Sequence, residues 1–174
     1  MNSDIPKVLH KICGTEMVNL VIKAASKSGI ISLTVVVPKQ HEKHRESIGS
    51  SVKYRIQTHR KGTGHALLNA KPDAIDSNLT VVLNGDIPLI SERTITRIVD
   101  QHKKSSNILT LATSNIDTPQ GYGRILRNST GEIEAIVEHA QTKSSYLDSI
   151  KEINAGVYCI QNKLIQQHSE GSAS

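Results

Sequence analysis

The sequence predicts a layered α/β fold in which helices flank a mostly parallel central sheet. Three observations favour this fold: β-branched apolar runs alternate with stretches of helical spacing, the connections between them are short, and no internal repeat or low-complexity linker interrupts them. A chain of 174 residues can bury a core without disulfides. We therefore expect one domain over residues 1–168 and a polar tail over residues 169–174.

The first expected elements follow a polar opening. Residues 18–28 place apolar side chains at helical spacing, and Gly29 stands where a C-terminal cap would lie. The β-branched run over residues 30–37, closed by Pro38, predicts a strand buried on both faces. Alternation over residues 52–58 predicts a second strand, and residues 64–71 a helix that follows a glycine-containing loop.

The second half of the chain continues the alternation. Residues 79–85 predict a third strand, residues 94–103 a helix and residues 107–113 another strand. Residues 121–139 resemble a hairpin that turns at residues 129–131, because Ser, Thr and Gly favour turns there. The last apolar strand covers residues 153–160, and we expect the polar stretch from Gln166 onward to fray.

Composition narrows the function classes. The net charge of +5 would suit nucleic acid, but the basic residues are spread along the chain and aromatic residues make up 2%, so a small anionic ligand is the simpler partner. No stretch approaches 18 apolar residues and the opening has no apolar core typical of a signal peptide, so we expect a cytoplasmic protein without a membrane span. Cys13 and Cys159 show no metal-binding spacing and are expected to be buried, reduced thiols.

Two stretches carry candidate chemistry. The strand predicted at residues 79–85 runs into Asn84-Gly85-Asp86, where open α/β sheets bind ligands, and a carboxylate there suits Mg²⁺. Gly85 would let the backbone approach a ligand closely. The alternative for Asp86 is a residue that only caps a turn. Likewise Gly62, Thr63 and Gly64 could present backbone N–H groups to a ligand, or simply form a tight turn.

Six motifs occur together in one order: SDIPKVLHKICGTEMV, QTHRKGTGHA, LNGDIPLI, PQGYGRI, IVEH and EINAGVY. As a set they resemble the uridylyltransferase domain of the bacterial bifunctional enzymes that make UDP-N-acetylglucosamine, a peptidoglycan precursor. The resemblance covers nearly the whole chain. It implies a Rossmann-like nucleotidyltransferase fold with a small β-hairpin subregion, Mg²⁺ as cofactor, and UTP and N-acetylglucosamine 1-phosphate as substrates.

The resemblance also implies roles for particular residues. Lys7 would contact phosphate, Asp86 would bind Mg²⁺, and these two would carry catalysis. The nucleotide would lie against Lys7, Asp86 and five further residues, Gln57, Gly62, Thr63, Asn84 and Gly85. The amino sugar would be held by Gly123, Glu138 and Asn154. Local chemistry agrees, since a Lys is a compact charge for phosphate and a Gln offers a donor and an acceptor to a pyrimidine edge.

The sequence departs from that family's pattern in three places. The family's opening strand and glycine-rich loop ending in Arg have no counterpart, and Met1 aligns with the Met of that loop, so we expect upstream codons to encode them. The family's second Mg²⁺ ligand, an Asn, and its acetyltransferase domain also have no counterpart. Ala140 stands where the family has Lys, which removes one positive contact. A binding protein without turnover, and a transferase for another base or sugar, therefore stay open alternatives, as does self-association.

Overall fold

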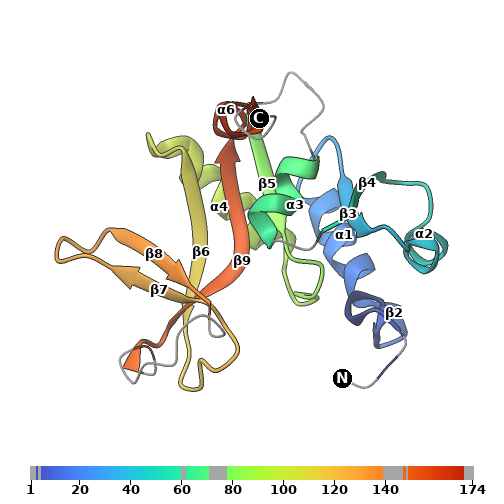
Figure 1. Cartoon of the computed structure of the whole chain (residues 1–174), viewed down its shortest axis with the longest axis horizontal. Coiled ribbons are helices and arrows are strands. Elements are labelled where there is room, and N and C mark those ends of the chain that lie inside the picture. Colours follow the sequence, from blue (N-terminus) through green and yellow to red (C-terminus); the bar gives the residue numbers. More distant parts are fainter. Residues whose placement is uncertain are drawn as a thin grey trace. The chain divides into compact units, whose positions relative to one another are not determined.

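The computed structural model describes residue 3 and residues 5–59, 62–70, 78–138, 147 and 149–170 (Figure 1). The chain divides into two compact units, residues 1–110 with 159–174 and residues 111–158. The boundaries fall inside strands β6 (Leu109–Asn115) and β9 (Glu152–Gln161). No helix in the described ranges has the length and apolarity that a bilayer crossing requires.

The first unit opens with a short 3-10 helix, η1 (Lys7–Leu9), and a two-stranded hairpin of β1 (Lys11–Ile12) and β2 (Thr15–Glu16). Cys13 and Gly14 form its turn with φ of 49° and 83°, as a two-residue hairpin turn requires. Cys13 is therefore exposed, contrary to prediction, whereas Cys159 is buried, and burial raises the pKa of its thiol. Both cysteines are free, as expected.

Helix α1 (Met17–Lys27) confirms the first predicted helix, since its apolar positions bury Val18, Val21 and Ala25. The chain then reverses at Gly29, whose φ of 81° favours a residue without a side chain. Strand β3 (Thr34–Pro38) and strand β4 (Lys53–Gln57) pair in parallel, as strands joined by a helical crossover do. Helix α3 (Thr63–Ala70) follows and packs on both strands.

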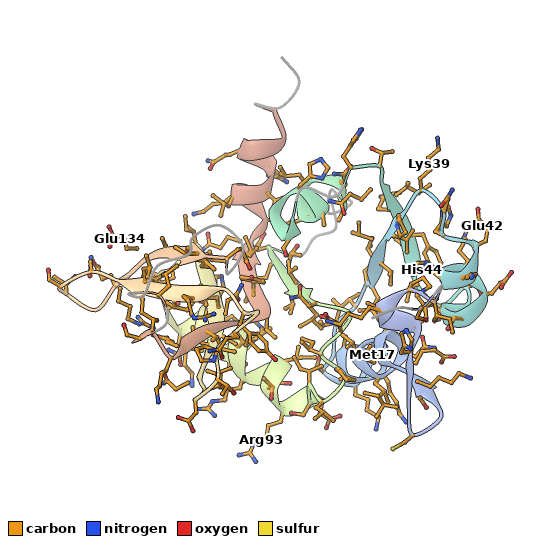
Figure 2. The ribbon with its side chains drawn as sticks, turned by 60° about the horizontal axis from the view of Figure 1, so that its bottom comes forward. Met17, Lys39, Glu42, His44, Arg93 and Glu134 are labelled. Carbon is orange, nitrogen blue, oxygen red and sulfur yellow. The ribbon has the colours of Figure 1, made fainter. Side chains whose placement is uncertain are left out.

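Two differences from the sequence prediction lie in this region. Helix α2 (Glu42–Ile48) was not predicted, because it buries only His44 and exposes polar side chains such as Glu42 (Figure 2). Residues 30–33 are not strand, and within β3 only Val37 is buried. The expectation of a strand buried on both faces from residue 30 was therefore wrong. Ile31 is 89% exposed, and the edge of β3 away from β4 borders a cavity.

The rest of the first unit comprises strand β5 (Leu79–Leu83), helix α4 (Glu92–Lys104), the end of β9 and helix α6 (Asn162–Glu170). The Ser91 side chain caps α4 by accepting a hydrogen bond from the Thr94 backbone. Helix α6 buries Ile165 and continues through Gln166, where the polar stretch was expected to begin, as far as Glu170. Residues 171–174 of the predicted tail lie outside the described residues.

The second unit contains the predicted hairpin. Strands β7 (Arg124–Arg127) and β8 (Ile133–Val137) pair in antiparallel register, and β7 also pairs with β9. The Gly131 backbone donates to the Asn128 carbonyl at the turn, with a φ of 83° at Gly131. The hairpin and its predicted turn are confirmed. The sheet containing β5 has the order β5-β9-β7-β8, with β6 also paired to β9.

A bidentate ion pair on the second unit gives a stability prediction. The Arg127 guanidinium donates to both Glu152 carboxylate oxygens, at 2.8 and 2.7 Å, and holds the pKa of Glu152 below its usual value of 4.5. Glu152→Gln is expected to lower the free energy of unfolding at pH 7 by about 0.5–1 kcal/mol. Because the folded pKa is depressed, this contribution is complete above pH 4.5 and disappears as pH falls through the folded value.

Urea unfolding from pH 7 down to pH 3 measures that difference between the wild type and Glu152→Gln. The control is Asp117→Asn, because Asp117 pairs with Lys151 but its side chain is 96% exposed. We expect the control to match the wild type at every pH. A Glu152→Gln deficit that stays constant down to pH 3 would show that the pair contributes by packing and not by charge.

Candidate functional site

A cavity of about 1310 Å³ in the first unit brings five predicted nucleotide-binding residues together. They are Gln57, Gly62, Thr63, Asn84 and Gly85. Strand β4 ends at Gln57, helix α3 begins at Thr63 and strand β5 ends at Leu83, so the gathering follows from the topology. The carboxyl end of β4, the residues that follow β5 and the start of α3 thus border this cavity, and α/β folds bind ligands beyond the carboxyl ends of their strands.

The two predicted catalytic side chains form an ion pair. Lys7 Nζ donates to Asp86 Oδ2 at 2.7 Å, across 79 residues of sequence. The Lys7 side chain is 64% exposed and that of Asp86 31% exposed, so the pair lies at the surface and both groups can reach a ligand. The Asp86 carboxylate thus contacts one cation in this structure, the Lys7 ammonium.

Gly85 has a role that the sequence did not indicate. A Cβ at this position would lie 3.3 Å from Val8 Cγ1 and 3.7 Å from Val18 Cγ2. A side chain at position 85 would therefore press against Val8, in the segment after Lys7, and would contact Val18 of helix α1. Because Val8 adjoins Lys7 and Gly85 adjoins Asp86, this contact brings the two charged residues into range.

Gln57 is oriented by a histidine that the sequence argument missed. Gln57 Nε2 lies 2.8 Å from His65 Nδ1, and the Asn69 side chain in turn reaches the His65 ring and its carbonyl. If Gln57 donates, the ring carries its proton on Nε2. His65 lies in the first turn of α3, which follows β4 after a short loop, so its side chain can contact the last residue of β4. The sequence could have indicated this contact, because the histidine stands close after the glycine loop.

The glycine loop leaves open space. Gly62 has a φ of 90°, and its carbonyl accepts the Ala66 N–H, which begins the hydrogen bonding of α3. Among the described residues, and leaving aside chain neighbours and the backbone of the helix itself, no atom lies within 4 Å of the Cβ position built on Gly62 or on Gly64. The glycines therefore leave the start of the helix uncovered, as a loop that binds a ligand by its backbone requires. Arg60 and Lys61 lie outside the described residues.

The three predicted sugar-binding residues meet in the second unit. The Asn154 backbone donates to the Gly123 carbonyl at 2.9 Å, and a Cβ on Gly123 would lie 3.1 Å from Glu138 Oε1. The Asn154 side chain accepts from the Gly156 N–H and donates to Tyr158 Oη at 2.6 Å. Strand alternation places residues 154, 156 and 158 on one face, so Tyr158 was within reach of a sequence argument.

Arg124, next to Gly123, is a third residue, after His65 and Tyr158, that the motif analysis did not single out. It is 1% exposed, and its guanidinium donates to the Tyr122 carbonyl, while Nε and Nη2 have no hydrogen-bond partner within the part of the chain that the structure describes. Positions 139 and 140, including the Ala140 departure, lie outside the described residues.

The residues present fit a magnesium ion bound mainly by its substrate. Within the described ranges no group of three or more His, Cys, Asp or Glu side chains is placed to hold a metal. Asp86 offers a single carboxylate, and it attracts the Lys7 ammonium in the structure. Mg²⁺ typically uses one or two carboxylates and completes its shell with water and phosphate oxygens. The donor set therefore suits a metal that arrives with a nucleotide.

Comparison with known proteins decides the family. Residues 2–174 match the model of the nucleotidyl transferase family. The chain belongs to the nucleotidyl transferase family. This nucleotidyl transferase is 38% identical over 167 residues to the Bifunctional protein GlmU of Clostridioides difficile, covering 96% of the chain and 36% of that relative. It is 41% identical over 165 residues to the same-named protein of Clostridium acetobutylicum, covering 94% of the chain and 36% of that relative.

Solved structures confirm the predicted α/β nucleotidyltransferase fold. HddC from Yersinia pseudotuberculosis superposes with a TM-score of 0.70 at 19% identity, covering 96% of this chain and 72% of that one. A CMP:2-keto-3-deoxy-manno-octonic acid synthetase complexed with CTP superposes with a TM-score of 0.71 at 16% identity, covering 97% and 73%. At these identities the likeness concerns the fold alone. The chain spans about a third of the length of its two GlmU relatives.

Proposed function

We propose that the chain carries a uridylyltransferase site that forms UDP-N-acetylglucosamine and pyrophosphate from UTP and N-acetylglucosamine 1-phosphate, in the cytoplasm. One observation carries the proposal: five residues assigned to the nucleotide from sequence line one cavity, beside the Lys7–Asp86 pair. The relatives named GlmU support the choice of reaction, since they share 38–41% of residues over nearly the whole chain.

The uracil would lie near the end of β4 and the start of α3. The contact with His65 uses the amide nitrogen of Gln57, which directs the carbonyl oxygen of that amide to a uracil N–H. The backbone N–H groups at the start of α3 would donate to the uracil carbonyls, since the space over Gly62 and Gly64 is open. Cytosine and the purines present other donors and acceptors, so this arrangement favours uracil.

The phosphates would lie between Lys7 and Asp86. An oxygen of the sugar phosphate attacks the α-phosphorus of UTP in line, a new P–O bond forms, and the bond to the β-phosphate oxygen breaks to release pyrophosphate. The Lys7 ammonium would move from Asp86 to the phosphate oxygens and stabilise their developing charge. Bound Mg²⁺ would supply further charge neutralisation at the same oxygens, with Asp86 as its protein ligand.

The amino sugar would bind against the second unit. Gly123 keeps the space next to the Glu138 carboxylate clear, and that carboxylate would accept from sugar hydroxyls. The Asn154 amide is fixed by Gly156 and Tyr158, so its orientation does not depend on the sugar. Such preorganisation lowers the entropy cost of placing the attacking phosphate.

Titration calorimetry tests the nucleotide assignment. We expect the chain to bind UTP weakly in the presence of Mg²⁺ and to bind ATP more weakly still. Gln57→Ala is expected to weaken UTP binding by about tenfold, the value of roughly one hydrogen bond. The matched control is Gln101→Ala, an exposed glutamine on α4. Equal affinity for UTP and ATP, or no heat from either at millimolar ligand, would contradict the assignment.

A further inference from the structure

A glutamine side chain by itself does not distinguish uracil from cytosine. Its amide has a carbonyl oxygen that accepts hydrogen bonds and a nitrogen that donates them, and half a turn about the last bond exchanges the two. Uracil presents a donor at ring position N3, whereas cytosine presents an acceptor there. A Gln57 that rotates freely would therefore serve either base. The choice between the bases depends on what fixes the Gln57 amide.

The His65 ring fixes the Gln57 amide in the structure. Gln57 Nε2 lies 2.8 Å from His65 Nδ1, and the Asn69 amide nitrogen lies 3.3 Å from the same ring atom. Amide nitrogens only donate, so both contacts require a lone pair on Nδ1, and the neutral ring then carries its proton on Nε2. The amide nitrogen of Gln57 is thereby occupied, and its carbonyl oxygen is the group left for a base.

Asn69 holds the His65 ring from within helix α3. Its amide nitrogen donates to the His65 carbonyl at 2.7 Å, one helical turn earlier, and lies 3.4 Å from ring Nε2. A carbonyl oxygen can only accept, so this bond also fixes which way round the Asn69 amide stands. The contacts among the three side chains are part-buried, so water competes for them less than it does at the surface.

We propose that His65 determines the base specificity of the nucleotide site, because it holds the Gln57 amide in the orientation that accepts from uracil N3–H. The inference rests on the proposed nucleotide site, and His65 is a positioning residue that acts through Gln57. Cytosine is rejected because its N3 lone pair would face the Gln57 carbonyl oxygen with no proton between them. A residue at position 65 that donates to Gln57 would turn the amide round and favour cytosine.

The tautomer of the His65 ring tests the contact without any nucleotide. Proton–nitrogen correlation spectra distinguish a ring nitrogen that carries a proton from one that does not, and the His65 signals are those missing from His65→Asp. We expect a proton on Nε2 and none on Nδ1. In Gln57→Glu the carboxylate only accepts, so we expect a proton on Nδ1. A wild-type ring with its proton on Nδ1, or a ring unchanged in Gln57→Glu, would overturn the inference.

Two variants with opposite hydrogen-bonding capacity test the specificity. His65→Asp keeps an acceptor opposite Gln57, whereas His65→Lys provides only donors. The measured quantity is the dissociation constant for CTP divided by that for UTP, each from an NMR titration of the α3 amides with Mg²⁺ present. Effects on the shared triphosphate cancel in this ratio. We expect the ratio to stay within about threefold of wild type in His65→Asp and to fall at least about tenfold in His65→Lys, the value of roughly one hydrogen bond.

His59 provides the matched control for charge. It is exposed, lies two positions after Gln57 and contacts Thr58 Oγ1 through its ring. His59→Asp and His59→Lys therefore introduce the same charges close to the site from a side chain that contacts Thr58. We expect both to leave the ratio unchanged, even where they alter the affinity for both nucleotides. Unchanged α4 amide signals show that each variant is folded.

Two results of the titrations would overturn the specificity role of His65. The first is a ratio that His65→Lys leaves unchanged. The second is an equal fall in His65→Asp and His65→Lys, which would show that His65 only supports the start of α3. Failure of the proposed function looks different, because the wild type would then bind no UTP although the His65 ring shows the expected tautomer. That result would contradict the nucleotide site and the specificity with it.

Discussion

Asp86→Asn is expected to reduce magnesium-dependent turnover by at least about a hundredfold, the value of one well-placed electrostatic group. The amide keeps the shape of the side chain but loses the charge that attracts a cation, and Asp86 is the carboxylate that lies against the candidate phosphate site. The Lys7 ammonium loses its partner at the same time, so binding of UTP without metal should hold or improve. A loss of magnesium-dependent turnover without a loss of metal-free UTP binding distinguishes a metal ligand from a residue that only supports the fold.

Pyrophosphate release measures this loss. The assay uses a chimera in which the chain replaces the matching region of the Clostridioides difficile relative. Asp117→Asn is the control, because it removes the same charge from a side chain that is 96% exposed in the second unit. Magnesium-dependent turnover in Asp86→Asn within about threefold of the chimera would show that another residue binds the metal.

The 174-residue chain on its own is expected to form product at least about a hundredfold more slowly than the Clostridioides difficile relative. Asp86 alone leaves magnesium held mostly by water and the nucleotide. In addition, Gln57 ends β4 and Asn84 follows β5, and neither of these strands contains a fully buried residue, so few buried neighbours hold the two side chains in place. Loose positioning of this kind is costly, because catalysis of phosphoryl transfer depends mainly on geometry.

Parallel pyrophosphate assays on the two proteins, at equal protein concentration and saturating substrates, measure this ratio. A rate for the chain within about tenfold of the relative would mean that the residues described here suffice for catalysis.

Local signals account for the parts of the fold that were predicted correctly. Apolar spacing and Gly29 define α1, alternation defines β4, and the Ser-Thr-Gly turn defines the hairpin of β7 and β8. Helix α2 lacks such a signal, since one buried residue, His44, anchors it. The apolar run at 30–37 indicated a buried strand, but burial depends on neighbours in space, and residues 34–36 of β3 border a cavity.

The candidate site likewise combines residues that the sequence predicted with contacts that it could not predict. Motif order located Lys7, Asp86 and Gln57, and the structure places them at the ends of elements that converge. The supporting contacts could not be read from the motifs, because they join distant segments. Gly85 packs on Val8, 77 positions earlier, and only the folded chain shows that this contact aligns Lys7 with Asp86. His65 contacts Gln57 because it lies in the first turn of α3. Tyr158 contacts Asn154 because both residues lie on the same face of β9.

The most direct test of the proposed uridylyltransferase site is product formation under single-turnover conditions, with the chain in excess over radiolabelled UTP. With Mg²⁺ and N-acetylglucosamine 1-phosphate we expect UDP-N-acetylglucosamine and pyrophosphate in equal amounts, and no product when dTTP, CTP or GTP replaces UTP. Gln57→Ala and Asp86→Asn should each slow the reaction. Product from UTP at the same rate in both variants, or equal product from UTP and CTP, would contradict the proposed site.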